Sequence, residues 1–252
     1  MSRFLMSVVA MVAAVLFASQ AQALLVTNDG SQVFFDTFEN GTPGNLPDTP
    51  DTSEVGTWTP GGTGAAWTIT NAGIPGAYSG SQYLQGNLSA GFPPARFDFA
   101  SAASSGTVKS AFMYYLPTGA SDFAPLTFRL FVNGVQNDRI FGLSHLSGLA
   151  LYDEENGASN GAVLFVKDEW NKVEVEYTIG AATAAVTITN SLGAQTGNIN
   201  AKAVNVGAPI TGGVFFTFSS TNNGAIYIDD IPEPASLALV GLGGALMLRR
   251  KR

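Results

Sequence analysis

Short runs of β-branched and aromatic residues alternate along this chain with clusters of Gly, Asn, Pro and Ser. Such runs are typical of β-strands bounded by turns, whereas an amphipathic helix repeats its apolar residues every three to four positions. No convincing helical periodicity occurs between residues 24 and 231. The pattern predicts about twelve strands, at residues 32–38, 66–70, 95–99, 108–116, 126–132, 137–143, 148–152, 162–167, 170–179, 184–189, 213–219 and 225–231.

Turn signals connect some of these strands into hairpins. Asn133-Gly134 follows residues 128–132, and this dipeptide supplies the two positive φ angles of a type I′ turn. A second hairpin is expected between residues 149–152 and 161–166, through the acidic loop 153–160. About twelve strands are more than a minimal immunoglobulin sandwich contains. We therefore expect an all-β fold, a two-sheet antiparallel jelly-roll sandwich.

The N-terminus has the pattern of a cleaved signal peptide. Arg3 is followed by an apolar stretch over residues 4–17 and then by Ala21-Gln22-Ala23, the small-x-small pattern that signal peptidase reads. The sequence therefore predicts a signal peptide over residues 1–23 and a mature protein that begins at Leu24.

The C-terminus has three parts in a fixed order. Pro232-Glu233-Pro234 comes first, the uncharged residues 235–248 follow, and the chain ends on Arg249, Arg250, Lys251 and Arg252. A helix over the uncharged part is about 21 Å long, against about 30 Å for a hydrocarbon core, so we expect only a transient membrane anchor. Terminal Lys and Arg stay cytoplasmic, which places the preceding body outside.

This tail resembles the PEP-CTERM sorting signal. The resemblance implies export by a Gram-negative bacterium that makes extracellular polysaccharide, and removal of the tail by an exosortase, a membrane protease. It also implies a final location at the cell surface or in the extracellular matrix. An ordinary single-span anchor followed by a basic cluster is the alternative. The expected organisation is a signal peptide (1–23), a jelly-roll domain (24–231) and a C-terminal sorting helix with its flanks (232–252).

Without the two terminal signals the protein is markedly acidic. Residues 24–231 hold 18 Asp plus Glu against 7 Lys plus Arg, a formal charge of −11 compared with −7 for the precursor. This charge opposes binding to nucleic acid and provides oxygen ligands for hard cations such as Ca²⁺. The chain has no Cys, which excludes disulfides and thiol catalysis.

Several segments of the body resemble the concanavalin A-like lectin and glucanase superfamily, which includes exported carbohydrate-binding modules. The matching segments are Phe35-Asp36-Thr37-Phe38-Glu39-Asn40-Gly41, Gly80-Ser81-Gln82-Tyr83-Leu84, Trp170-Asn171-Lys172-Val173-Glu174-Val175 and Ala225-Ile226-Tyr227-Ile228-Asp229-Asp230-Ile231. In this resemblance the last segment is the closing strand that pairs with the first.

If the first and last strands are neighbours, their carboxylates converge on one point. The candidate ligands for a structural Ca²⁺ there are Asp36, Glu39, Asp229 and Asp230. Two or three carboxylates with main-chain carbonyls and water would complete the usual six to eight oxygens. The acidic loop 153–160 is a second candidate, although a turn rich in Asp, Asn and Gly needs no metal.

Aromatic side chains on loops and strand ends are the candidates for stacking on sugar rings. They are Trp58, Trp67, Tyr78 and Tyr152, whereas we expect Phe112, Phe128, Phe215, Phe218 and Trp170 in the core. Carbohydrate is therefore a candidate partner.

Catalysis has weaker support in the sequence. Glu174 and Glu176 share one strand face about 7 Å apart, but the third acid of the glucanase Glu-x-Asp-x-Glu pattern is missing. A solvated strand face explains the pair, and His145 has no evident catalytic partner. We expect a non-enzymatic structural or adhesive component of an exopolysaccharide or biofilm matrix. A calcium-assisted lectin-like module and a divergent glycosidase are the alternatives.

Overall fold

The computed structural model describes residues 24–39, 41–45, 55–60, 67–72, 75–78, 80–87, 94–120, 126–132, 135–145, 149–216 and 224–229. These residues form sixteen strands and one 3₁₀ turn, η2 (Ala203–Asn205). The strands are β1 (Leu24–Asn28), β2 (Ser31–Asp36), β3 (Thr57–Pro60), β4 (Trp67–Thr70), β5 (Tyr83–Asn87), β6 (Pro94–Ala103), β7 (Thr107–Tyr115), β8 (Thr127–Val132), β9 (Val135–His145), β10 (Ala150–Asp153), β11 (Ala158–Leu164), β12 (Trp170–Thr178), β13 (Thr183–Asn190), β14 (Gly193–Asn200), β15 (Ile210–Phe216) and β16 (Ala225–Asp229).

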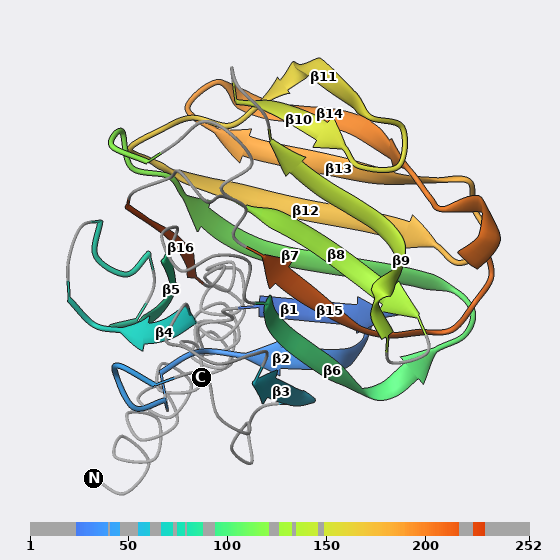
Figure 1. Ribbon diagram of the computed structural model, residues 1–252, viewed down its shortest axis with the longest axis horizontal. Coiled ribbons are helices and arrows are strands. Elements are labelled where there is room, and N and C mark those ends of the chain that lie inside the picture. Colours follow the sequence, from blue (N-terminus) through green and yellow to red (C-terminus); the bar gives the residue numbers. More distant parts are fainter. Residues whose placement is uncertain are drawn as a thin grey trace, which may run out of the picture. The chain divides into compact units, whose positions relative to one another are not determined.

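The strands lie in two antiparallel sheets (Figure 1). The larger sheet has nine strands in the order β14-β13-β12-β7-β16-β5-β4, with β1 beside β7 and β2 beside β1. The smaller sheet has seven strands in the order β11-β10-β9-β8-β15-β6-β3. The all-β prediction and the two-sheet sandwich are confirmed.

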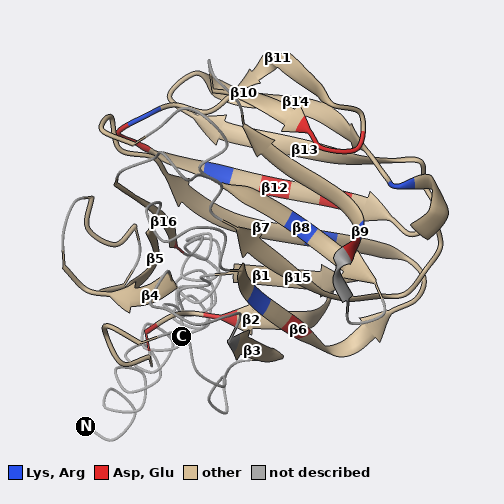
Figure 2. Cartoon of the chain, in the orientation of Figure 1, with Lys and Arg blue, Asp and Glu red and all other residues tan. Residues whose placement is uncertain are grey.

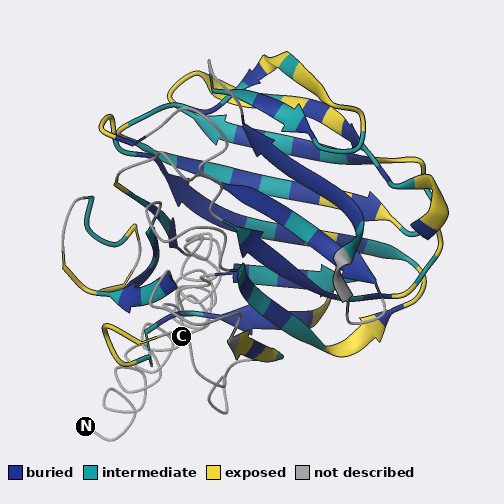
Figure 3. Ribbon diagram, in the orientation of Figure 1, coloured by how far each residue is buried: buried dark blue, intermediate teal, exposed yellow. Residues whose placement is uncertain are grey.

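Aromatic rings from both sheets meet in the core. The Phe112 ring of the larger sheet lies 5.1 Å, between centroids, from both Phe128 and Phe215 of the smaller sheet. All three side chains are fully buried, as the sequence predicts, and Phe218 lies outside the described residues. Burial alternates along most strands of the larger sheet (Figure 3), so one face of each strand packs inward and the other is directed outward.

Both predicted hairpins form. Val132 of β8 pairs with Val135 of β9, which is the register of a two-residue connection, although Asn133 and Gly134 themselves lie outside the described residues. In the second hairpin Asp153 pairs with Ala158, so the loop is shorter than the predicted 153–160 because both its ends join the ladder.

Three strands, β1, β3 and β14, were not expected from the sequence. The resemblance at Gly80-Ser81-Gln82-Tyr83-Leu84 implies a strand, and β5 begins there at Tyr83. The β14 sequence, Gly-Ala-Gln-Thr-Gly-Asn-Ile-Asn, is poor in β-branched and aromatic residues. It nevertheless pairs with β13 along its whole length. Strand formation there depends on the neighbouring strand, since strand propensity is weaker than tertiary context.

The expected pairing of the last strand with the first is wrong. β16 pairs with β5 and β7, while β1 pairs with β2 and β7. Asp229 lies opposite Met113 and Leu24 lies opposite Phe112, on the edge of β7 that β12 leaves open. β16 and β1 therefore follow one another end to end along β7.

Both terminal segments lie outside the described residues. The signal-peptide residues Ala21 and Ala23 and the tail residues Pro232, Glu233, Pro234, Arg249, Arg250, Lys251 and Arg252 are among them. In the part of the chain that is described, no helix is long and apolar enough to cross a membrane.

Candidate functional site

A row of aromatic side chains crosses the outer face of the larger sheet. Trp170 of β12 pairs with Tyr115 of β7, and Tyr115 pairs with Tyr227 of β16. Paired residues of neighbouring strands share a sheet face, so the three rings project to the same side. That side is the outer one, because it is also the side of Lys172 and Glu174 on β12, whose alternate residues are buried.

Two further tyrosines extend this row into one aromatic cluster. The Trp170 ring lies 5.4 Å from Tyr115, 5.9 Å from Tyr78 and 6.4 Å from Tyr83. Tyr227 lies 5.4 Å from Tyr83 and 6.1 Å from Tyr115. These separations are in the range of favourable edge-to-face and offset ring contacts. Each of the five rings therefore packs against at least one other ring of the cluster.

The cluster ranges from buried to exposed. Tyr83 and Tyr115 are buried, Trp170 and Tyr227 are half-buried, and Tyr78 is 45% exposed. The exposed Tyr78 ring contacts the half-buried Trp170 ring. Rigid rings with one accessible side are suited to stacking on a flat ligand, because little conformational entropy is lost on binding.

The phenol groups of Tyr83, Tyr115 and Tyr227 stay protonated well beyond neutral pH. Burial, then Tyr227 and Asp229, raise the pKa of Tyr83. Burial, then Asp168 and Tyr227, raise the pKa of Tyr115, and burial alone raises that of Tyr227. Each hydroxyl is therefore a neutral group that donates and accepts hydrogen bonds beside an apolar ring.

Charged side chains lie on the same face, further along β12. Lys172 Nζ is 2.7 Å from Glu174 Oε1, and Lys109 Nζ is 2.9 Å from Glu176 Oε2. The two glutamates considered for catalysis are thus each ion-paired with a lysine. Both are partly exposed, with side-chain exposures of 43% and 54%.

The predicted metal ligands are not brought together. Leu24 and Asp36 are register partners on the inward-facing side of their strands, whereas Asp229 shares the outer face with Tyr227. Asp229 and Leu24 occupy successive positions along β7, and a step of one residue reverses the side-chain direction.

Protein donors also contact each of these carboxylates. Asp36 accepts bonds from the Phe38 main chain at 2.6 Å and from the Trp58 indole, and Asp229 accepts one from the Tyr78 main chain. The Tyr78 contact links Asp229 directly to the aromatic cluster.

Glu39 binds the segment that precedes β5. It accepts bonds from the main chains of Ser81 and Gln82, both at 2.8 Å, and from the Ser81 hydroxyl at 2.7 Å. Asp230 lies outside the described residues. Within the described part of the chain no three His, Cys, Asp or Glu side chains gather in a way that could hold a metal.

Two of the predicted sugar-stacking residues are core residues instead. Trp58 packs between Phe34, Phe38 and Phe97, and Trp67 contacts Phe215. They are only 7% and 1% exposed because both face the other sheet. Tyr78 joins the aromatic cluster, and Tyr152 is half-buried on the outer face of β10.

Sequence reasoning missed the main members of the cluster, and it placed Trp170 in the core. Strand alternation contained the signal for that correction. Val173, Val175 and Tyr177 are buried on β12, so the even-numbered Trp170 had to face outward with Lys172. The register that joins Trp170 to Tyr115 and Tyr227 could not be read from the sequence.

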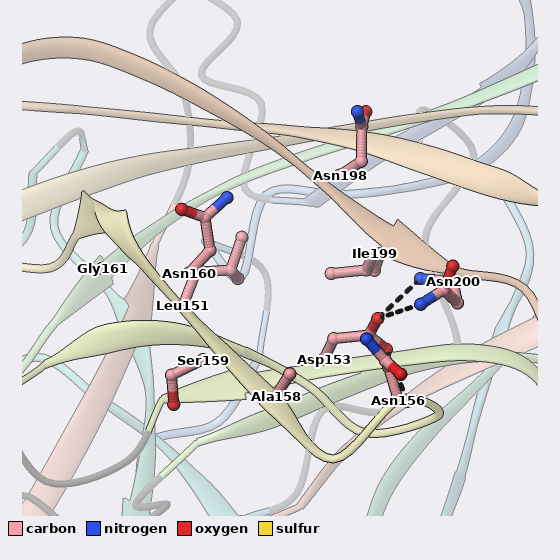
Figure 4. A pocket seen from close by; sticks show the side chains of 10 residues that line it. All are labelled: Leu151, Asp153, Asn156, Ala158, Ser159, Asn160, Gly161, Asn198, Ile199 and Asn200. Atoms are coloured by element: carbon pink, nitrogen blue, oxygen red, sulfur yellow. Dashed lines mark hydrogen bonds between the residues drawn. The ribbon is translucent and has the colours of Figure 1, made fainter.

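A polar cleft lies at the far edge of the sandwich, between the β10–β11 hairpin and β14 (Figure 4). Its volume is about 300 Å³, and its lining is Leu151, Asp153, Asn156, Ala158, Ser159, Asn160, Gly161, Asn198, Ile199 and Asn200. Asp153 accepts two bonds from Asn200, at 2.9 Å from its main chain and 2.7 Å from its amide. These bonds connect β10 of the smaller sheet to β14 of the larger sheet. Neutral amides and the Ser159 hydroxyl also line the cleft.

The fold is that of the concanavalin A-like jelly rolls. The catalytic domain of a glycoside hydrolase family 131 protein from Coprinopsis cinerea superimposes with a TM-score of 0.52 and 15% identity, over 79% of this chain and 92% of that one. A GH131 β-glucanase catalytic domain from Podospora anserina gives a TM-score of 0.51 and 15% identity, over 79% and 94%. Lectin II from Ulex europaeus also matches, with a TM-score of 0.40 and 11% identity over 65% and 92%.

The chain carries a PEP-CTERM protein-sorting motif at residues 230–252. This motif implies an exported protein that is processed by exosortase and is secreted or held at the cell surface. No curated protein matches the sequence.

Proposed function

We propose that this protein binds polysaccharide outside the cell through the aromatic cluster of Tyr78, Tyr83, Tyr115, Trp170 and Tyr227, as a structural or adhesive component of an exopolysaccharide or biofilm matrix. The observation that carries the proposal is the Tyr78–Trp170 contact at 5.9 Å, in which an exposed ring continues into a rigid half-buried row. The sorting motif supports an extracellular location. The fold is shared with β-glucanase catalytic domains.

The charge of the domain favours a neutral glycan. Residues 24–231 have a formal charge of −11, which repels polyanionic polysaccharides. On the same outer face Lys172 and Lys109 are paired with Glu174 and Glu176, so these two lysines add no net positive charge. We therefore expect neutral, flat chains of pyranoses to bind in preference to uronic-acid polymers.

The proposed role is non-enzymatic. A paired-carboxylate glycosidase needs one carboxyl group that is protonated at working pH, and such a group is usually desolvated. Glu174 and Glu176 are instead partly exposed and paired with lysines. The test is whether the protein releases reducing sugar from β-glucans. Release by the wild type that is lost in Glu174→Gln would establish the glycosidase alternative and contradict this part of the proposal.

Calcium-assisted recognition is the second candidate. Its support is the buried Asp229 carboxylate, which binds the main chain of Tyr78 in the aromatic cluster. The measurement is glycan affinity before and after EDTA treatment, with Ca²⁺ restored afterwards. An affinity that falls and recovers would support a calcium site, and an unchanged affinity would leave the aromatic surface as the sole determinant.

Maturation is expected to involve two proteases. Signal peptidase would produce Leu24 as the first residue, and exosortase would remove the tail near Pro232 after residues 235–248 have held the precursor transiently in the inner membrane of a Gram-negative cell. The intact mass of the extracellular form tests this route. A product that retains Arg249 to Arg252 would contradict it.

The central experiment measures binding of the exported protein to a panel of neutral and acidic bacterial polysaccharides. Trp170→Ala is expected to weaken binding to the preferred glycan about 10-fold, since the loss of one ring contact of about 1.4 kcal/mol changes the affinity by that factor. Tyr152→Ala is the comparison variant. Tyr152 is also a predicted sugar-stacking residue, but its half-buried ring lies on the outer face of the other sheet, so its loss should leave the affinity unchanged if the cluster binds the glycan. No saturable binding to any polysaccharide would refute the proposed function.

A further inference from the structure

The β13–β14 hairpin at one end of the larger sheet is uncharged. From Thr183 to Asn200 no Asp, Glu, Lys or Arg occurs, although the surrounding domain is strongly acidic (Figure 2). β14 is the last strand of its sheet. Edge strands of soluble proteins commonly have charges, Pro or bulges that prevent pairing with another chain, and β14 has none of the first two.

The main chain of β14 offers unpaired groups along this edge. Asn200 donates its N–H to Asp153 in β10 and not to β13, so this N–H is directed away from β13. Because the hydrogen-bonding direction alternates along an antiparallel strand, the main-chain N–H and C=O groups of Asn198, Thr196 and Ala194 are also directed away from β13. Among the described residues no hydrogen-bond partner is found for these outward groups.

The other sheet edges are shorter or protected. Among the described strands β2 pairs only with β1, but its ladder shifts register between Val26 and Thr27, and Phe35 on its open side pairs with Val55 through two main-chain hydrogen bonds. β4 and β3 are only four residues long, and β3 ends on Pro60. On β11, the Ala162 N–H is bound by the Asn160 side chain and the Leu164 N–H by the Gln195 side chain. β14 is thus the long edge in the described part of the chain that lacks these protections.

Exposed apolar side chains lie at both ends of β14. Leu192, in the turn before the strand, is 60% exposed, and Val204 and Val206, after it, are 80% and 37% exposed. With Tyr78 they are the exposed large hydrophobic residues of the described chain. Apolar groups that border an open edge indicate an interaction surface.

We infer that two copies of this chain join edge to edge through antiparallel β14 strands, with Thr196 opposite Thr196 and Ala194 opposite Asn198. This register uses all three outward residues of both strands and obeys twofold symmetry. In this register the Leu192 turn of each copy lies beside Asn200 at the C-terminal end of β14 in the other copy. Val204 and Val206 follow that end in the chain. Because β14 carries no charge, this pairing places no like charges directly opposite each other, and the two larger sheets become one continuous sheet.

The pairing is independent of glycan binding, because the aromatic cluster lies on other strands. A dimer would nevertheless present two clusters on one continuous sheet. Two sites increase the avidity for a repetitive polymer without any new contact to the sugar.

A single cysteine tests the register directly, because the chain has no Cys of its own. In the exported protein, Thr196→Cys would place two thiols on Cα atoms about 5.5 Å apart, within the range of a disulfide. Mild oxidation is expected to give a covalent dimer on a non-reducing gel. Thr178→Cys on β12 is the matched control: each threonine is exposed and shares a hydroxyl contact with a neighbouring strand, at 2.9 Å for Thr196 and 3.1 Å for Thr178.

Light scattering tests whether the unmodified protein forms the same pair. The wild-type protein is expected to have twice the monomer mass at about 0.1 mM, a concentration at which weak homodimers form. Thr196→Lys places two like charges opposite each other and should give monomers, whereas Thr178→Lys should remain dimeric. Asn198→Lys serves as a second edge variant if circular dichroism shows that Thr196→Lys is misfolded. A monomeric wild type, or equal cross-linking of the two cysteine variants, would overturn the inference.

Discussion

The outer faces of the two sheets differ in how their side chains are satisfied. On the smaller sheet, the Arg129 guanidinium lies 2.7 Å from Glu154 and stacks over Phe216 at 4.9 Å. Arg139 contacts Glu154 at 3.5 Å and also pairs with Glu155. The charged groups and the phenyl ring of this face thus form ion pairs and a cation–π contact with one another.

On the larger sheet, the aromatic cluster has no cation over its rings among the described contacts, and its rings contact mainly one another. One accessible ring, Tyr78, remains at its rim. One face of this sandwich is therefore stabilised by contacts among its own side chains, whereas the other has an accessible aromatic ring. Mutations should therefore separate stability from binding.

The largest effect is expected from Arg129→Ala. The side chains of Arg129 and Glu154 are only 17% and 12% exposed, so removal of the cation leaves a largely buried carboxylate without that partner. We expect a loss of about 2–3 kcal/mol in the free energy of unfolding, with glycan affinity unchanged for the folded fraction. Urea denaturation monitored by tryptophan fluorescence measures the loss. A change below about 0.5 kcal/mol, the size of an exposed ion pair, would show that the ion pairs of this face contribute little to stability.

Tyr78→Ala should have the opposite profile. Its ring is exposed and contacts Trp170, so its removal opens the rim of the cluster with little loss of core packing. We expect about 3- to 10-fold weaker glycan binding, from the loss of about 0.5–1.5 kcal/mol of ring contact. Isothermal titration calorimetry gives the affinity, and a thermal melt serves as the control. Equal affinity with a large fall in Tm would assign the ring a purely structural role.

Alkaline pH should affect the two faces differently. The pKa values of Tyr83, Tyr115 and Tyr227 are raised in the folded protein, mainly by burial. The folded state thus favours the protonated phenols, and this contribution is complete below the unfolded pKa of about 10 and is lost as pH rises through the folded values. Arginine keeps its charge over the same range.

Stability and glycan binding should therefore both decline above about pH 10, together with the absorbance change of tyrosinate near 295 nm. A Tyr227→Phe variant is expected to reduce this decline. Tyrosines that titrate at their ordinary pKa without any loss of binding would show that the cluster is not buried as described.

The smallest effect is expected from Lys109→Ala on the outer face of the larger sheet. Lys109 and Glu176 are 60% and 54% exposed, and ion pairs of this kind contribute about 0.2–1 kcal/mol, less at high salt. The change matches Arg129→Ala in charge but not in burial. A cost as large as that of Arg129→Ala would remove the contrast between the faces.

Local patterns in the sequence were sufficient for the strand class and several turns. The alternation in residues 170–179 gives the buried face of β12, and the hairpin predicted from Asn133-Gly134 agrees with the Val132–Val135 register of β8 and β9. These features depend on residues close together in the chain. The aromatic cluster depends on β5, β7, β12 and β16, which lie far apart in sequence, so its members could not be grouped beforehand.

Two errors have the same origin. Trp58 and Trp67 follow Gly-rich and Pro-rich segments and were expected at exposed positions, yet both face the opposite sheet. The calcium prediction required Asp36 and Asp229 on one side, but the register of β1 and β16 along β7 directs them to opposite sides. In both cases the decisive quantity is which way a side chain faces, and a one-residue shift of register reverses it.

Local sequence features are enough to predict an exported chain with a PEP-CTERM sorting motif and a body of two antiparallel β-sheets. Hydrophobic periodicity, turn residues and charge are local properties, so they can be read without a structure. The folded structure is needed to see which aromatic residues meet, which carboxylates are separated and which sheet edge is open. Those outcomes follow from strand order and register, which the packing of the whole core selects among many pairings that local sequence permits equally.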